Sequence, residues 1–277
     1  MPIRLLLWFW QQEHNLEIRV ADSAWLLRLA GGKLLTCLLF SETVSRNNMP
    51  SPAARSLKIT VDPDTAVLGL LNLPPGARAC YVFAPGAGAG ITHSFMEAVS
   101  NGLAERGVAT LRYQFPYMEK GSRRPDPPAL CHKTVRAAVE EARRRVSDLP
   151  LVAGGKSFGG RMTSQAQADA PLSGVRGLAF FGFPLHPAKK PSTARADHLV
   201  RCKLPMLFLQ GTRDELAQLD LLEPIVKALG KNASLKKIEA ADHSFHVLAR
   251  SGRNDREVLD ELLDGFVAWL GTVRVSG

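Results

Sequence analysis

The sequence predicts an α/β fold, in which a mostly parallel twisted sheet carries helices on both faces. From Leu57 onward, short apolar runs alternate with segments of helical periodicity, and this alternation is typical of a parallel sheet covered by helices. The last such segment, 255–270, places six large apolar residues on one stripe at helical spacing, which indicates a helix packed against a sheet. A chain of 277 residues can form one large domain of this kind or two small ones.

Strands are expected at the apolar runs 57–62, 67–73, 79–84, 109–113, 151–154, 178–182, 206–210 and 235–239. Helices are expected between or after most of them, at 94–106, 131–146, 159–169, 219–229 and 255–270. In open α/β sheets, ligands bind outside the carboxyl ends of the strands. Functional residues are therefore expected in the loops that follow the strand ends.

The first 48 residues differ from the rest of the chain. They contain three of the four tryptophans and lead into SRNNMPSPAARS, a segment with the composition of a linker. We expect residues 1–48 to be an N-terminal extension, either loosely attached or mis-assigned as coding sequence with Met49 as the true start. Residues 49–277 are expected to form the α/β domain.

Composition argues against several classes of protein. No apolar run approaches the ~20 residues that span a bilayer, and the run after Arg4 is shorter than a signal-peptide core, so we expect a soluble, cytoplasmic protein that does not bind membranes. The four cysteines form no C-x-x-C pair, which argues against a zinc site or a compact disulfide framework. The net charge of +9 comes from scattered residues, which favours a solvated basic surface over nucleic-acid binding.

The segment LPLVAGGKSFGG, residues 149–160, admits two interpretations. Its GKS triplet matches the end of a phosphate-binding loop, but such a loop needs a glycine where the chain has Pro150. Gly155, Ser157 and Gly159 also spell G-x-S-x-G, the strand–turn–helix corner that exposes a nucleophilic serine. The residues before the motif predict a buried strand and those after it a helix, so the second interpretation fits.

Two further strand ends carry the residues that a nucleophilic serine needs. The strand at 206–210 is followed by Asp214, and the strand at 235–239 is followed by His243. The chain order Ser157, Asp214, His243 is the order of an α/β-hydrolase. We predict that His243 takes the proton of the attacking hydroxyl and that Asp214 holds the imidazole in the correct tautomer.

Other residues compete for these roles. Asp242 and His246 could form a metal pair, but the sequence shows no obvious third ligand. Asp197 and Asp220 could replace Asp214, although neither follows a strand end directly. We therefore expect no metal and no other cofactor.

A tetrahedral intermediate carries an oxyanion that needs backbone donors. Phe158, the residue after the nucleophile, is expected to supply one N–H group. The glycine-rich loop YVFAPGAGAG, residues 81–90, is expected to supply the second from Ala87, while Gly86 and Gly88 let the backbone approach a ligand. This loop lacks the G-x-G-x-x-G spacing of a dinucleotide site.

The chain resembles the small α/β-hydrolase family related to dienelactone hydrolases in six segments: APGAGAG, RYQFPYMEKGSRRPDPP, GGKSFGGRMTS, FFGFPLHP, LFLQGTRDELA and DHSFHV. That family includes predicted bacterial hydrolases, a testis-expressed mammalian protein and a subunit of the non-specific-lethal chromatin complex. The resemblance covers residues 57–270 and also implies the α/β-hydrolase fold and the triad roles of Ser157, Asp214 and His243. Dienelactone hydrolase uses a cysteine nucleophile, so its own activity is not implied.

Two loops are expected to overhang the site. Segments 114–130 and 186–203 together hold eight basic and three acidic residues, a balance that could favour anionic acyl substrates by focusing field lines in the cleft. A generic basic surface is the alternative. Four apolar side chains of these loops and of the strand end before them could line an acyl pocket or could pin the loops to the core: Phe115, Tyr117, Phe183 and Leu185.

The leading prediction is a serine hydrolase that cleaves a carboxylic ester, thioester or small amide through an acyl-enzyme on Ser157. Its partner would be a small acyl substrate. The alternative is a catalytically quiet scaffold of the same fold whose basic surface binds a partner, as the chromatin relative suggests. A complete triad favours the enzyme, because a scaffold does not need all three residues.

Overall fold

The computed structural model describes residues 17–21, 24–28, 34–36 and 54–273. The chain divides into two compact units, residues 1–50 and 51–277. In the first unit, three strands form an antiparallel sheet in the order β1–β2–β3: Glu17–Ala21, Ala24–Arg28 and Leu34–Thr36. Met49, Cys37 and most of the predicted linker lie outside the described residues, and the predicted boundary after residue 48 stays a prediction.

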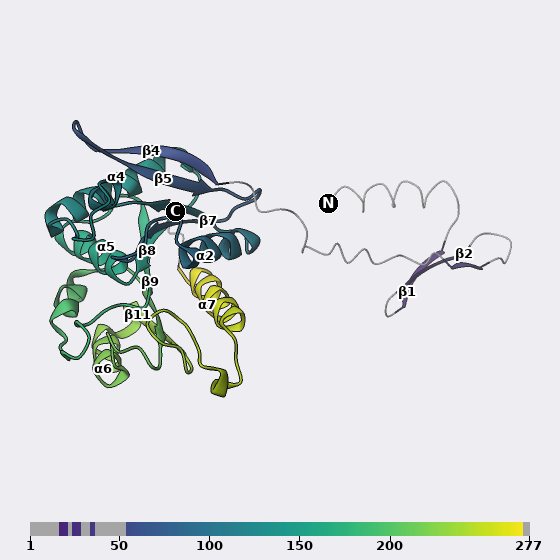
Figure 1. The fold of residues 1–277 in the computed structure, drawn as a ribbon. Helices are drawn as coiled ribbons and strands as arrows, with labels where there is room; N and C mark the ends of the chain where they lie inside the picture. The colour runs from purple at the N-terminus through teal and green to yellow at the C-terminus, as the bar shows by residue number, and fades with distance from the viewer. Residues whose placement is uncertain (1–16, 22–23, 29–33, 37–53, 274–277) are drawn as a thin grey trace. The chain divides into compact units, whose positions relative to one another are not determined.

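The second unit is built on an eight-stranded sheet in the order β11–β10–β9–β8–β6–β7–β5–β4 (Figure 1). β4 (Arg55–Asp62) and β5 (Thr65–Asn72) form an antiparallel hairpin, and β5 pairs antiparallel with β7. The remaining neighbours are parallel, so the predicted mostly parallel sheet is confirmed. The parallel strands are β6 (Cys80–Ala84), β7 (Ala109–Tyr113), β8 (Leu151–Lys156), β9 (Val175–Phe181), β10 (Met206–Gly211) and β11 (Ala233–Ile238).

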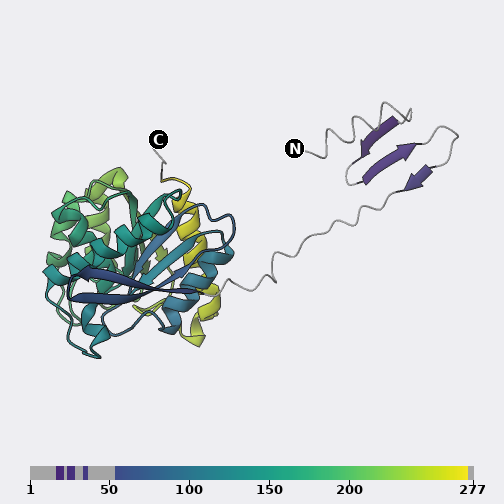
Figure 2. The ribbon, with the colours of Figure 1, turned by 90° about the horizontal axis from the view of Figure 1, so that it is seen from above.

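Helices cover both faces of this sheet, as the prediction required (Figure 2). One face carries α2 (Ser94–Glu105) and α7 (Asp255–Leu270). The other face carries α4 (Pro128–Arg145), α5 (Phe158–Asp169) and α6 (Leu219–Leu229). The short helix α3 (Pro116–Glu119) and three 3₁₀ helices were not anticipated: η2 (Ala194–Arg201), η3 (Gly230–Asn232) and η4 (Ala249–Ser251).

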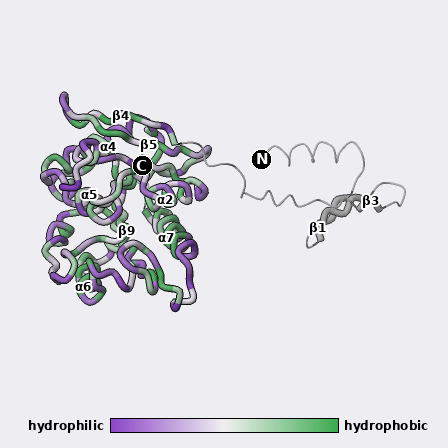
Figure 3. The backbone as a smooth tube through the Cα atoms, viewed as in Figure 1, coloured by the Kyte–Doolittle hydropathy of each residue, from purple (hydrophilic) through white to green (hydrophobic). Residues whose placement is uncertain are grey.

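The buried apolar residues fall into two clusters, one on each face of the sheet. Leu178 and Phe180 of β9 belong to the cluster under α4, α5 and α6, whereas Ala179 and Phe181 belong to the cluster under α2 and α7. This division follows from the strand pleat, which points successive side chains to opposite faces. Strands covered on both sides read as continuous apolar runs. The helix α7 is amphipathic, and both hydrophobic and hydrophilic colours occur along it in Figure 3.

The strand order reverses between β6 and β8. β6 connects through α2 to β7 on one side, whereas β8 connects through α5 to β9 on the other. The carboxyl ends of β6 and β8 therefore form the topological switch point, where α/β sheets open a crevice for ligands. The glycine-rich loop leaves the end of β6, and Ser157 follows the end of β8.

Candidate active site

Ser157 occupies a sharp corner between β8 and α5. Its backbone has φ 49° and ψ −115°, a conformation that is unfavourable for any residue with a side chain and that persists only where the surroundings enforce it. The N–H of Ser157 donates to the carbonyl of Phe181 at 3.0 Å, and α5 begins at the next residue. The corner therefore projects the serine hydroxyl from the carboxyl edge of the sheet.

The two glycines of the G-x-S-x-G motif are required by the close approach of α5 to β6. A Cβ atom on Gly155 would lie 2.5 Å from the carbonyl oxygen of Ala84. A Cβ atom on Gly159 would lie 2.5 Å from the oxygen of Pro85 and 2.6 Å from that of Ala84. The clashing atoms belong to the backbone and cannot move without displacing β6 or α5, so only glycine fits at either position.

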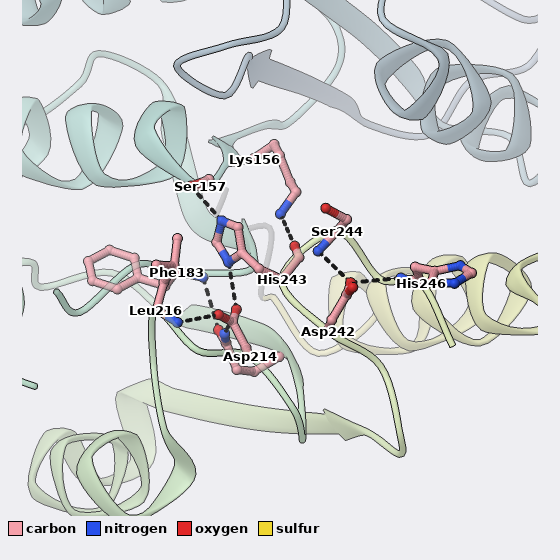
Figure 4. A network of polar contacts seen from close by, with 10 residues as sticks. Lys156, Ser157, Phe183, Asp214, Leu216, Asp242, His243, Ser244 and His246 are labelled. Atoms are coloured by element: carbon pink, nitrogen blue, oxygen red, sulfur yellow. Dashed lines mark hydrogen bonds and ion pairs between the residues drawn. The ribbon is translucent and has the colours of Figure 1, made fainter. Parts of the chain in front are cut away.

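Three side chains from separate loops meet at this edge (Figure 4). His243 Nε2 lies 2.8 Å from Ser157 Oγ, and His243 Nδ1 lies 2.7 Å from Asp214 Oδ2. The loops that carry them follow β8, β10 and β11. The structure thus brings together the three residues that the sequence singled out, with the imidazole between the hydroxyl and the carboxylate.

The Asp214 carboxylate accepts hydrogen bonds from three donors, and its side chain is fully buried. Oδ1 accepts the N–H of Leu216 at 2.8 Å, and Oδ2 accepts from the side chain of Gln210 as well as from His243. Gln210 is itself oriented by the N–H of Phe183, which donates to its Oε1 at 2.9 Å. Because the carboxylate is an acceptor, His243 must carry its proton on Nδ1, which leaves Nε2 free to accept the serine proton.

Residues 77–271 match the model of the α/β-hydrolase domain family. The chain belongs to this family. Similar solved structures include dienelactone hydrolase from Anabaena variabilis, with 20% identity over 80% of this chain and 99% of that chain and a TM-score of 0.66. A lidless α/β serine hydrolase from Xanthomonas campestris matches with 19% identity over 80% of this chain and 98% of that chain, and with a TM-score of 0.61. Esterase 2 from Thermogutta terrifontis matches with 19% identity over 81% of this chain and 97% of that chain, and with a TM-score of 0.59. The predicted α/β-hydrolase family is confirmed, and the chain shares its fold with a dienelactone hydrolase.

This α/β-hydrolase contains a second Ser–His contact, between Ser164 Oγ and His198 Nε2 at 2.7 Å. Ser164 lies fully buried within α5, and its hydroxyl also donates to the carbonyl of Arg161. Burial, reinforced by Arg201 and Arg161, lowers the pKa of His198 to about 4, so the ring is a weak base. Within residues 54–273 no carboxylate is hydrogen-bonded to it. We interpret this pair as a structural link between α5 and η2.

The residues that the sequence offers as alternatives for this site have other partners. His246 Nδ1 contacts the Asp255 carboxylate at 2.8 Å on the surface. Asp242 Oδ1 accepts the N–H of His246 at 3.0 Å and so stabilises the turn. Asp197 and Asp220 line a groove between η2 and α6. Within the described ranges, no cluster of three His, Cys, Asp or Glu side chains could hold a metal ion.

The glycine-rich loop after β6 lies against Ser157. A Cβ atom on Gly86 would be 4.0 Å from Ser157 Cβ. The carbonyl of Gly86 accepts the N–H of Ala89 at 3.3 Å, which forms a turn whose exposed tip holds Ala87 and Gly88. Since a trans peptide points its N–H opposite to its carbonyl, the N–H of Ala87 faces away from the interior of this turn.

Four apolar residues were predicted to line an acyl pocket or to pin the loops to the core. Phe115, Phe183 and Leu185 are 0% exposed and Tyr117 is 2% exposed, so their burial favours the packing alternative. The ring of Phe115 lies 5.5 Å from that of Phe158. The Tyr117 hydroxyl donates to the carbonyl of Ala87 at 2.8 Å and so orients the glycine-rich loop.

Sequence reasoning missed two residues of the site. Gln210, which orients Asp214, is the only polar residue in the strand MLFLQG before the final glycine, and a buried amide there is a usable signal. The second residue is Lys156, which lies inside the serine motif, where the sequence relates a lysine only to a phosphate-binding loop. Its ammonium donates to the backbone carbonyl of His243.

Proposed function

We propose that this α/β-hydrolase is a serine hydrolase that cleaves a carboxylic ester, thioester or small amide through an acyl-enzyme on Ser157. One observation carries the proposal. A continuous hydrogen-bonded chain runs from the Ser157 hydroxyl through both ring nitrogens of His243 to the buried Asp214. This is the arrangement that converts a poor nucleophile into a good one at neutral pH.

In the proposed reaction, Ser157 Oγ attacks the substrate carbonyl carbon while His243 Nε2 takes the hydroxyl proton. The imidazolium is stabilised by its Nδ1–H bond to Asp214. His243 then gives the proton to the leaving oxygen, sulfur or nitrogen as the carbon–heteroatom bond breaks. A water molecule repeats the sequence on the acyl-enzyme, so that the acid is released and the serine regains its proton.

The oxyanion of the intermediate is assigned to two backbone donors. Phe158 is the first residue of α5, and the first N–H groups of a helix have no intrahelical acceptor and point along the positive end of the helix dipole. The N–H of Ala87 faces away from its own turn, and the loop is held by Tyr117. Donors fixed in this way need no reorganisation during the reaction.

The strained backbone of Ser157 also favours an enzyme over a scaffold. Such a conformation costs about 1–3 kcal/mol and is retained where function requires it. A catalytically quiet scaffold could replace the serine and relax the corner.

We also propose a cytoplasmic location, which the buried free thiols of Cys80, Cys131 and Cys202 favour. No helix in the described residues is long and apolar enough to cross a membrane.

An anionic substrate is the second part of the proposal. Arg161 lies one turn after Ser157 on α5, its guanidinium is 5.7 Å from the Phe158 ring, and its buried Nε has no hydrogen-bond partner. Burial and the nearby charge of Arg195 lower the pKa of Arg161. Among residues 54–273 neither arginine pairs with a carboxylate. Two neighbouring guanidinium groups without a carboxylate partner, one of them on the residue four positions after Ser157, favour a carboxylate or phosphate on the substrate.

The anionic preference is tested with matched anionic and neutral esters. We expect Arg161→Gln to lower kcat/KM for the anionic ester about tenfold more than for the neutral one, and added salt to lower the anionic value selectively. Arg256→Gln serves as control, because Arg256 is an exposed arginine of α7 paired with Asp260. If neither the substitution nor salt changes the ratio between the two esters, the preference is refuted.

The hydrolase itself is tested by labelling with a fluorophosphonate probe and mapping the modified peptide. We expect the parent protein to be modified on Ser157 and the Ser157→Ala variant not to be modified. Ser164→Ala is the matched control, since it removes the other serine that contacts a histidine. With an ester panel, Ser157→Ala should lower kcat by about 10⁶. An unlabelled parent, or a Ser157→Ala variant that keeps its activity, would refute the hydrolase.

A further inference from the structure

Lys156 is the last residue of β8 and directly precedes Ser157. Figure 4 shows its side chain directed away from the serine and towards the backbone of the histidine loop, where the ammonium donates to the carbonyl oxygen of His243. The ammonium also lies 5.8 Å from the ring centroid of Phe95 and 5.0 Å from that of Phe245. These two rings stack on each other at 5.7 Å. The charged donor therefore lies beside this stacked pair, within cation–π distance of both rings, an arrangement that stabilises a cation.

The same corner leaves no room for another side chain. A Cβ atom on Gly182 would lie 3.0 Å from Lys156 Nζ and 3.4 Å from His243 Cε1. Burial lowers the pKa of Lys156 to about 8, and the carboxylates of Asp214 and Asp242 partly offset this effect. These two carboxylates carry the charges that act on the ammonium, and the His243 ring lies at the same corner.

The histidine turn has few other connections to the nucleophile. It runs between the bridge partners Ala241 and Val247, and Asp242 Oδ1 closes it from within. The His243 ring is held by Asp214, which belongs to the loop after β10. Lys156 instead ties the main chain of His243 to β8, the strand that leads into the serine.

We propose that Lys156 is a positioning residue of this site: its ammonium, which lies beside the stacked rings of Phe95 and Phe245, holds the main chain of His243 so that the imidazole reaches Ser157. This inference rests on the proposed hydrolase function. A methionine would pack against the two rings without burying a charge, so the lysine is explained by its bond to His243. Proton transfer needs the two heavy atoms within hydrogen-bonding distance, and a small shift of the turn would break that contact.

The tether depends on the charge of the ammonium. Below pH of about 8, Lys156 is protonated, bonds to the His243 carbonyl as a cation and interacts with both rings. Above that pH the amine is neutral, and its attraction to the rings and to Asp214 and Asp242 is lost. The reaction of Ser157 is therefore expected to slow on the alkaline side of pH 8 in the parent protein.

The experiment compares Lys156→Met with the parent and with Lys237→Met, a control on β11 whose lysine forms an exposed pair with Glu223. The first readout is amide hydrogen exchange of residues 241–247, which does not need catalysis. The second is the rate of fluorophosphonate labelling from pH 6 to pH 10. Lys156→Arg is the conservative variant, because arginine keeps its charge and donors throughout this range.

We expect the amides of residues 241–247 to exchange about tenfold faster in Lys156→Met than in the parent. Fluorophosphonate should label this variant about 10- to 100-fold more slowly at pH 7. Its labelling rate should also show no decline above pH 8. Lys156→Arg should recover part of the labelling rate, and that rate should also show no decline above pH 8. Lys237→Met should match the parent in both the exchange and the labelling rate. Parent-like exchange in the turn of Lys156→Met overturns the proposal. If the parent is not labelled at all, the hydrolase function fails, whereas the exchange measurement still decides whether the tether exists.

Discussion

The substitution Asp214→Asn isolates the role of the buried carboxylate. The three groups around it are all donors: the side chain of Gln210, the backbone N–H of Leu216 and His243 Nδ1. Asparagine has the same shape but only one oxygen, so its NH₂ group must face at least one of these donors. If the NH₂ group replaces Oδ2, the imidazole can accept from it only by moving its proton from Nδ1 to Nε2.

The expected losses of catalytic rate and of stability in Asp214→Asn follow from these contacts. With the proton on Nε2, His243 cannot accept the proton of Ser157, and catalysis should fall by about 10⁴. If the NH₂ group instead replaces Oδ1, the ring keeps its tautomer but the N–H of Leu216 is buried without an acceptor. One unsatisfied buried donor costs about 1–3 kcal/mol of unfolding free energy. The first orientation costs a similar amount, because the NH₂ group of Gln210 then loses its acceptor at Oδ2. The large loss of rate therefore identifies the first orientation, and the loss of stability accompanies both.

The assay pairs ester-hydrolysis rates with urea unfolding of the same variants. Asp220→Asn is the matched control, because Asp220 is an exposed aspartate of α6 that the sequence left as an alternative acid. We expect Asp214→Asn to lose about 10⁴ in kcat and Asp220→Asn to retain the parent value. A parent-like kcat in Asp214→Asn, or a comparable loss in Asp220→Asn, would show that the assigned acid is the wrong one.

Three further predictions concern the same corner of the fold. Gly159→Ala should yield little folded protein, measured by circular dichroism, because its Cβ would lie 2.5 Å from a backbone oxygen. Ser164→Ala should keep at least half of the parent kcat, since the hydroxyl lies in a buried structural contact. The unfolded state binds more protons than the folded state between the pKa of Lys156, about 8, and its ordinary value of 10.5. Across that window the parent should therefore gain up to ~3 kcal/mol of unfolding free energy relative to Lys156→Met in urea titrations.

The sequence predicted elements well where the signal is local. Helix α7 begins at Asp255, as expected, because Asn254 accepts the N–H groups of Arg256 and Glu257 in a capping box. Strand β9 was predicted at 178–182 but runs from Val175 to Phe181. The prediction began too late because Arg176 interrupts the apolar run, although it lies exposed on the strand. It ended too late because Gly182 turns to a positive φ of 70° and leaves the sheet.

The site could be predicted only in part for the same physical reason. Ser157, Asp214 and His243 each follow a strand end, so a local pattern marks each of them. The hydrogen bond from Lys156 to His243 joins residues 87 positions apart, and no spacing rule in the sequence predicts such a contact. Whether Phe115 lines a pocket or fills the core depends on packing from several elements, which the apolar run in the sequence leaves open.

The loops of the site are joined mainly by backbone hydrogen bonds. The loop after β10 is tied to the histidine turn by the N–H of Arg213, which donates to the carbonyl of Ala241 at 2.9 Å. The end of β9 is tied to β10 by the N–H of Gly182, which donates to Leu209 at 2.8 Å. Such ties are insensitive to pH because amides do not titrate in the physiological range. The tether from β8 to the turn differs, since its donor is the ammonium of Lys156. A rise in pH through about 8 should therefore loosen the contact between Ser157 and His243 while the rest of the site keeps its geometry.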